Sequence, residues 1–426
     1  MKMYEYPELG EVLYKEQLGN GLTVCVLPRP GVTRKLAYFV TDFGSIHTDF
    51  TLEGREIHAP AGIAHFLEHK MFDLPGGRDV SAELASLGAG TNAFTSYDMT
   101  AYYIACTDNF EKCLRLLIEF VSTPYFTDES VAKEMGIIDQ EIGMSEDAPD
   151  SRVFEDLMRA MYKEHLIKVP ILGTSETIRQ ITPEILHDCH RAFYTPGNMI
   201  LCVVGDVDPH RVAVIATEML GDAPRPVGQK LRPWNEDMET TGSNPLSRME
   251  VSMPTFQLGF KCEPTGTGED AIRQEIVGDL AAEALFGESS QLYLKLYEEG
   301  LIDSSFGGGF ETIDGMSMLL CSGDSDEPEA VRAAVLKEAE RIAREGVAET
   351  DFQRMKRSAM GRRIRDLDSF SSTCFRLCAY HFSDFDYFRF PGVYQKIERG
   401  EIQEFLARII RENRCALSVI EPAKEA

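Results

Sequence analysis

The chain has 426 residues, of which 43% are hydrophobic and 26% are charged, so it can bury more than one core and we expect two or more domains. Its formal net charge of −26 at pH 7 disfavours nucleic acid and anionic lipid as partners. The sequence has no run of roughly 20 apolar residues that could span a membrane and no apolar signal segment near its start, so we expect a cytoplasmic protein without a membrane partner.

The first part of the chain begins with strands and continues into helices. LTVCVLP (22–28) and KLAYFVTDFGS (35–45) are typical of strands, and a helix is predicted near 60–72. GTNAFTSYDMTAYYIACT (90–107) predicts two strands joined by a turn. Further helices are predicted at 111–124, 128–144, 152–162 and 181–194, before a buried strand at 198–208.

A polar stretch rich in Pro and Gly then separates two series of elements that follow the same order. The second series is predicted as strand 248–263, helix 270–287, strand 315–324, helices 329–346, 349–366 and 401–413, and strand 415–422. We therefore predict a duplicated chain, with a first domain over 1–222, a linker over 223–247 and a homologous second domain over 248–426. The ten cysteines contain no CxxC pair, which indicates reduced core residues.

The motif His65-Phe66-Leu67-Glu68-His69 carries the clearest chemistry. Residues four apart on a helix project side by side, so both imidazoles can reach one cation, and Glu68 lies close to the same face. Two imidazoles and one carboxylate suit zinc with an open position for water, and Glu68 could then act as the general base. The alternative is a solvent-facing helix in which His and Glu merely form polar pairs.

A third ligand is available downstream in KEMGIIDQEIGM (133–144). Glu134 and Glu141 are seven residues apart, which is two helical turns on one face. One carboxylate could bind the metal while the other holds a ligand histidine.

These motifs resemble the pitrilysin/insulinase family of inverted-zincin peptidases, which includes the mitochondrial processing peptidase. The likeness spans nearly the whole chain and is strongest to the bacterial YmfH-like branch, through HFLEHKMF, GAGTNAFTSYDMTAYYI, EMGIIDQE, FYTPGNMILCVVGDVD and FGESSQLYLKLYEEGLI. The resemblance implies an α+β fold of the processing-peptidase/LuxS-like metallohydrolase type, with two homologous α/β halves, each a mostly antiparallel sheet covered by helices. It also implies one Zn²⁺ per chain, bound by His65, His69 and Glu141, with Glu134 as a supporting carboxylate.

The same resemblance suggests where a peptide substrate binds. Asn92, Ala93 and Phe94 match the family's substrate-binding edge, to which a peptide adds as an extra strand. The alternative is that they are ordinary sheet residues. The second domain is expected to carry no metal, because its counterpart of the motif helix (279–287) contains no histidine.

One departure from the family pattern bears on activity. Active relatives carry an Arg followed seven residues later by a Tyr, whereas aligning KLYEEGLID (295–303) puts Leu296 and Asp303 at these positions. Neither side chain can donate a hydrogen bond to a developing oxyanion as Arg and Tyr can.

Three functions remain open on the sequence. The first is a zinc endopeptidase that encloses peptides or unfolded segments between halves or subunits, completed by a homologous partner that lacks HxxEH and carries the Arg/Tyr pair, or by a homodimer. The second is a weakly active or inactive assembly or chaperone-like subunit of a hetero-oligomer, and the third is a zinc hydrolase of another class.

Overall fold

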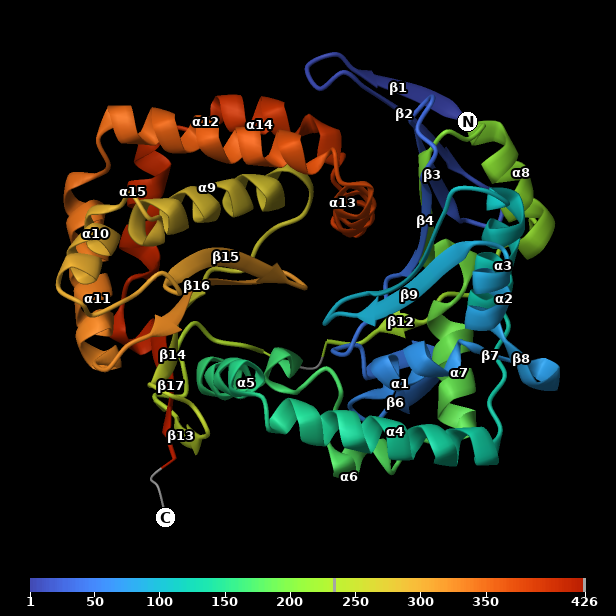
Figure 1. Ribbon diagram of the computed structural model, residues 1–426, viewed down its shortest axis with the longest axis horizontal. Helices are drawn as coiled ribbons and strands as arrows, with labels where there is room; N and C mark the ends of the chain where they lie inside the picture. Colours follow the sequence, from blue (N-terminus) through green and yellow to red (C-terminus); the bar gives the residue numbers. More distant parts are fainter. Residues whose placement is uncertain (233–234, 424–426) are drawn as a thin grey trace.

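The computed structural model describes residues 1–232 and 235–423. Two positions of the predicted linker (233–234) and the last three of the predicted second domain (424–426) lie outside the described residues. Figure 1 shows two halves side by side, each with a sheet and covering helices. Within the described part of the chain, no helix combines the length and apolar character needed to cross a bilayer.

The first half is organised around a seven-stranded sheet of order β1-β2-β3-β11-β4-β10-β9, in which only the β3–β11 pair is parallel among the described strands. Its strands are β1 (Lys2–Tyr6), β2 (Glu11–Gln17), β3 (Thr23–Pro28), β4 (Lys35–Thr41), β9 (Ala89–Thr95), β10 (Thr100–Cys106) and β11 (Met199–Gly205). Its helices are α1 (Ile63–Lys70), α2 (Val80–Ser86), α3 (Phe110–Ser122), α4 (Asp128–Glu146), α5 (Pro149–Met161), α6 (Ser175–Ile178), α7 (Pro183–Phe193) and α8 (Pro209–Leu220). Short strands β5 (Asp49–Leu52), β6 (Arg55–His58) and β12 (Gln229–Lys230) form a small sheet, and β7 (Asp73–Leu74) pairs with β8 (Arg78–Asp79).

The second half repeats this arrangement in a five-stranded sheet of order β13-β17-β14-β16-β15. Its strands are β13 (Leu246–Met249), β14 (Thr255–Cys262), β15 (Gly307–Ile313), β16 (Met316–Asp324) and β17 (Cys415–Pro422). Its helices are α9 (Gly268–Phe286), α10 (Gln291–Glu298), α11 (Pro328–Glu345), α12 (Glu349–Asp366), α13 (Phe370–Phe382), α14 (Phe390–Lys396) and α15 (Arg399–Ile409). The first pair, β13–β17, is parallel and the others are antiparallel, as in the series β3-β11-β4-β10-β9. This match confirms an α+β fold with two related halves.

The halves exchange helices. The helix α5 of the first half packs on β14 and β17 of the second sheet, where Leu157 and Met161 share a core cluster with Leu320 and Ala416. Reciprocally, α13 of the second half packs on β4 and β11 of the first sheet. Each half therefore covers part of its partner's sheet.

The predicted elements are found with small shifts, and three differences are informative. The strand predicted over 248–263 is divided into β13 and β14, and the strand predicted over 35–45 ends at Thr41. The elements that the sequence analysis missed include β1, β2, α2, α6, α8, α10, α13, α14, β15 and the pair β5–β6. All ten cysteines are among the described residues, and each is a buried free thiol, as predicted.

Candidate active site

The helix α1 places the HxxEH residues against the first sheet. It begins after Gly62, whose φ of 89° lies in the left-handed region, and a Cβ there would come within 2.4 Å of the Leu172 carbonyl oxygen. Phe66 and Leu67 are fully buried in the core of the first half. Because these apolar side chains fix one face of the helix, the opposite face directs His65 and His69 toward α4.

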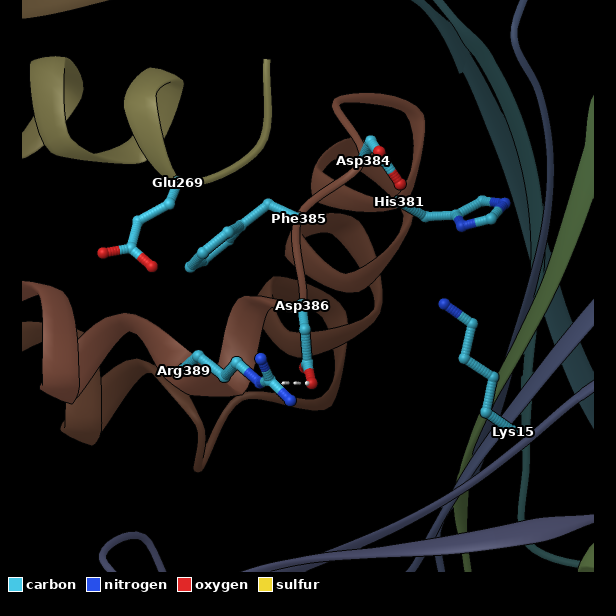
Figure 2. A pocket seen from close by; sticks show the side chains of 7 residues that line it. All are labelled: Lys15, Glu269, His381, Asp384, Phe385, Asp386 and Arg389. Carbon is cyan, nitrogen blue, oxygen red and sulfur yellow. Dashed lines mark ion pairs between the residues drawn. The ribbon is translucent and has the colours of Figure 1, made fainter.

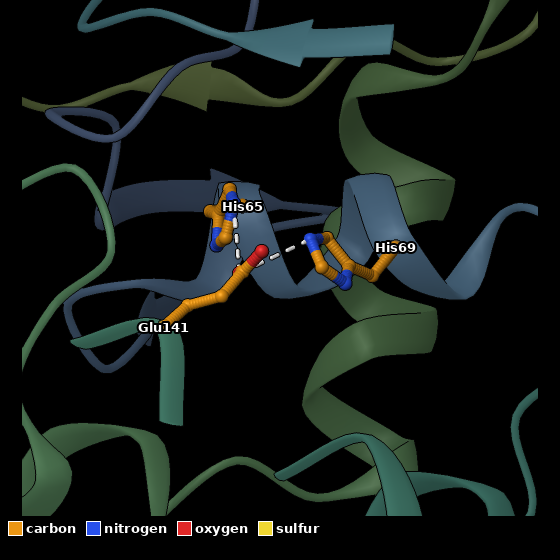
Figure 3. A group of neighbouring side chains, drawn as sticks. All are labelled: His65, His69 and Glu141. Atoms are coloured by element: carbon orange, nitrogen blue, oxygen red, sulfur yellow. Dashed lines mark ion pairs between the residues drawn. The ribbon is translucent and has the colours of Figure 1, made fainter. Parts of the chain in front are cut away.

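Three side chains converge between α1 and α4. Glu141 Oε2 lies 3.8 Å from His65 Nε2 and 3.5 Å from His69 Nε2, and one ligand atom of each residue lies within 4.8 Å of the others (Figure 3). Glu141 Oε2 is buried and has no hydrogen-bond partner among the described residues. The Glu141 side chain as a whole is 42% exposed, and a cation held between the three groups would satisfy its one buried oxygen. Two imidazoles and one carboxylate are a donor set that suits zinc.

The protonation of the histidines is compatible with metal binding. Burial, with a smaller contribution from His69, lowers the pKa of His65 to about 4, so its ring is neutral near pH 7. Burial by itself would lower the pKa of His69, but the hydrogen bond with Glu134 and the charge of Glu141 raise it. A cation bound at His69 Nε2, the nitrogen that faces Glu141, would displace any proton held there.

Glu134 orients the second histidine. His69 Nδ1 lies 3.0 Å from Glu134 Oε1, a contact that favours a proton on Nδ1 and leaves Nε2 as the nitrogen that could bind a cation. The hydrogen bond with His69 also lowers the pKa of Glu134, so the carboxylate is ionised. Lys70, only 1% exposed, places its Nζ 4.0 Å from Glu134 Oε2 and pairs with Asp73. The carboxylate therefore lies between the His69 ring and the Lys70 ammonium.

Glu68 lies beside the three converging groups and is held by the sheet. The residue is 9% exposed, and its Oε2 accepts a hydrogen bond from Thr95 Oγ1 at 2.6 Å. Burial raises the pKa of Glu68, while the Thr95 hydroxyl opposes this rise. A buried carboxylate with a raised pKa suits proton transfer.

The strand β9 is an edge of the first sheet, since it pairs with β10 on one side and with no described strand on the other. The Ala93 N–H donates to Asn92 Oδ1 at 2.9 Å, so it points to the open side. Phe94 packs near Phe375 of α13, with ring centroids 5.9 Å apart. The structure thus places Asn92, Ala93 and Phe94 on an open edge that runs toward Thr95 and Glu68.

Leu296 and Asp303 lie away from this site. Leu296 is fully buried in the core of the second half, and Asp303 Oδ1 accepts a hydrogen bond from the Ser305 N–H at 2.7 Å. Leu296 belongs to α10, which lies on the opposite side of the molecule from α1 (Figure 1), and Asp303 follows that helix in the chain. The helix α10 packs on α9 and α11 of the second half.

A separate cavity of about 390 Å³ lies where β2 meets the segment between α13 and α14 (Figure 2). Its lining consists of Lys15, Glu269, His381, Asp384, Phe385, Asp386 and Arg389. These charges are mixed in sign, and Asp386 is already engaged by Tyr6 and Arg389. The cavity contains no predicted site residue.

Two residues of the site were missed by the sequence analysis. Thr95 is 27 positions from Glu68, and no spacing rule connects a strand residue to a helix residue at that distance. Lys70 had a local signal, because it is a lysine on a helix with apolar neighbours, but its contact with Glu134 depends on how α1 and α4 pack.

Comparisons with known proteins identify similar sequences and similar structures. Residues 55–175 match a family model described as insulinase (peptidase family M16), and residues 180–359 match one described as the peptidase M16 inactive domain. An uncharacterized zinc protease of Bacillus subtilis (strain 168), YmfH, is 36% identical over 431 residues, with 99% of each chain covered. The crystal structure of an M16-like peptidase from Alicyclobacillus acidocaldarius has a TM-score of 0.93 at 32% identity, covering 99% of this chain and 100% of that one. A protease from Helicobacter pylori has the same fold, with a TM-score of 0.82 at 19% identity over 96% of this chain and 99% of that one.

Proposed function

This chain belongs to the insulinase (M16) family of zinc proteases, and we propose that it is an endopeptidase that holds one zinc ion through His65, His69 and Glu141. The observation that carries the proposal is the buried Glu141 Oε2, which faces both Nε2 atoms and has no hydrogen-bond partner among the described residues. A pair of polar residues on a solvent-facing helix would leave no such oxygen buried and unsatisfied.

The residues around the metal ligands have distinct roles in peptide hydrolysis. When bound, zinc supplies a Lewis acid that acidifies water and polarises the scissile carbonyl. Glu68 takes the proton of the attacking water on its carboxylate and passes it to the leaving amine. Glu134 keeps the His69 Nδ1 protonated, so that Nε2 stays available as a ligand atom.

The open edge of β9 is proposed as the peptide-binding strand. An extended peptide would add there through main-chain hydrogen bonds and displace Asn92 Oδ1 from the Ala93 N–H. Phe94 and Phe375 would contact its side chains. This binding mode selects extended segments, which favours short or unfolded peptides enclosed between the halves or between subunits.

Zinc analysis together with cleavage of an unstructured peptide tests the proposal. His65→Ala, His69→Ala and Glu141→Gln should lose zinc, because each removes a ligand. Glu68→Gln should retain one zinc per chain and its fold but lose about 10²- to 10⁴-fold in turnover, because an amide cannot accept the proton. A metal-free Glu68→Gln protein beside a fully loaded His69→Ala protein would reverse the assignment of roles.

The working enzyme is proposed to include a second subunit. With Leu296 buried and Asp303 engaged in its own loop, this chain lacks the Arg and Tyr donors at those positions, and loss of one oxyanion donor costs about 10²- to 10³-fold in rate. A homologous chain that lacks HxxEH but carries the Arg/Tyr pair should accelerate cleavage when mixed with this one. Full activity of the single chain, unchanged by such a partner, would instead favour a homodimer or donors such as Tyr293 or Tyr297.

A further inference from the structure

One oxygen of the Glu68 carboxylate is fixed to the sheet and the other is free. Glu68 Oε2 accepts a hydrogen bond from Thr95 Oγ1 at 2.6 Å, within the range of about 2.5–2.7 Å for a hydroxyl bound to a carboxylate. No other hydrogen bond reaches this carboxylate from the residues that the structure describes. Rotation of the Glu68 carboxylate is therefore restrained by a single hydroxyl group.

The direction of this hydrogen bond follows from the neighbours of Thr95. Thr100 of β10 is paired with Thr95 of β9, and its Oγ1 lies 3.5 Å from Thr95 Oγ1 and 2.8 Å from the Phe43 carbonyl oxygen. A hydroxyl has one proton, and the Thr100 proton goes to the closer acceptor, Phe43. An ionised carboxylate cannot donate, so Thr95 must give its own proton to Glu68.

Thr95 also connects Glu68 to the proposed peptide-binding edge. It is the last residue of β9 and directly follows the segment 92–94 on the open side of the sheet. Side chains alternate along a strand, so Thr95 shares a face with Ala93, which packs on the core of the first half near α1. A shift of this strand would therefore move the hydroxyl that restrains the Glu68 carboxylate.

We propose that Thr95 is a positioning residue that holds Glu68 Oε2 and so directs Oε1 toward the reacting water. This inference rests on the proposed peptidase function. The hydroxyl group, and not the packing of the side chain, carries the role. Thr95→Val removes the hydroxyl with almost no change in shape, whereas Thr95→Ser retains it.

Kinetics of four proteins test this inference: the wild type, Thr95→Val, Thr95→Ser and Thr91→Val. Thr91 is the matched control, since its hydroxyl lies on the same strand face but donates to the Tyr103 carbonyl oxygen at 3.0 Å. Thr95→Val should lower kcat by about 10- to 100-fold, the cost of a misplaced catalytic group, with KM and zinc content unchanged. Thr95→Ser and Thr91→Val should stay within about threefold of the wild type. Equal losses in Thr95→Val and Thr95→Ser would overturn the inference.

Crystal structures of the zinc-loaded Thr95 variants test the positioning without relying on turnover. In Thr95→Val the Glu68 carboxylate should rotate away from β9, and in Thr95→Ser it should keep its hydrogen bond. An unmoved Glu68 in Thr95→Val would overturn the inference, whatever the kcat of that variant. Failure of the wild type to cleave peptides would instead count against the proposed function.

Discussion

Replacement of Glu236 by glutamine tests how firmly the segment between the two halves is fixed. The side chain of Glu236 is 2% exposed, and Lys261 Nζ donates to its Oε1 at 2.5 Å. The backbone N–H groups of Lys163, Glu164 and His165 also donate to its two oxygens, at 3.0, 2.8 and 2.7 Å. Glu236 thus ties the connecting segment to both halves.

The size of the effect follows from this burial. Glutamine keeps one carbonyl oxygen but removes the charge, so Lys261 keeps only neutral acceptors, which include the carbonyl oxygens of Met161 and Glu239 at 3.1 and 3.3 Å. Removing one partner of a buried ion pair costs about 3–5 kcal/mol of folding free energy. For 426 residues the unfolding entropy is about 0.9 kcal/mol/K, so Tm should fall by about 3–6 °C if the chain unfolds as one unit.

Calorimetry of Glu236→Gln beside Glu269→Gln measures this loss. Glu269 pairs with Lys396 at 2.6 Å on an exposed surface, and exposed pairs contribute little, so its variant should keep Tm within about 1 °C. Adding Lys261→Met to Glu236→Gln should restore part of the stability, because the unpaired ammonium is then gone. Equal Tm values for the two single variants would refute the reasoning.

The ionisation of Glu236 should also make the stability of the fold depend on pH. Burial by itself would raise the pKa of Glu236, but the hydrogen bonds from Lys261 and the backbone lower it to about 2 from the ordinary 4.5. Because the pKa in the folded state is lowered, ionised Glu236 stabilises the chain above about pH 4.5, and this contribution is lost as the pH falls toward 2. In urea titrations, the stability difference between the wild type and Glu236→Gln should therefore shrink on acidification. A constant difference would contradict this sign.

Three further outcomes are expected at or near the proposed metal site. Glu134→Gln should weaken zinc binding by about 10- to 100-fold in a chelator competition, because the partner of His69 Nδ1 loses its charge; unchanged affinity would show that Glu134 has no role in orientation. Gly62→Ala should lower the free energy of unfolding in urea by more than about 1 kcal/mol, because its Cβ would meet the Leu172 carbonyl oxygen. Gly76→Ala is the control, since Gly76 also has a positive φ but a Cβ there would meet open space. Mass spectrometry of the native chain should find one zinc ion, since α9 lacks histidine, and two ions would contradict this.

The sequence predicted those parts of the site that follow from helical geometry. His65 and His69 are four residues apart and Glu134 and Glu141 seven apart, so each pair was expected on one helix face. The structure brings His65, His69 and Glu141 together, and their role as zinc ligands stays a proposal. Spacing alone could not decide which carboxylate faces the histidines, because that depends on the rotation of α4 against α1. In the structure, Glu134 contacts His69 Nδ1, and Glu141 faces the Nε2 atoms of both histidines.

Long-range packing accounts for what the sequence could not supply. Periodicity indicates that one face of α5 is buried, but it does not indicate that the face meets the sheet of the other half. Composition likewise predicted a linker over 223–247 but gave no sign of its long-range contacts. Glu236 within it accepts backbone hydrogen bonds from a segment more than 70 residues earlier. The boundaries at 222 and 247 remain predictions.

The two halves of this one chain exchange α5 and α13 in the way that two chains of a domain-swapped dimer exchange elements. A fragment ending near residue 222 would expose the apolar face of α5 and the sheet surface that α13 covers, and the complementary fragment would expose the reverse. Such fragments could satisfy these surfaces only by finding each other or by pairing with copies of themselves. Chains built from two such halves therefore have a route to domain-swapped oligomers. A break in the connecting segment would turn one folded molecule into two mutually dependent fragments.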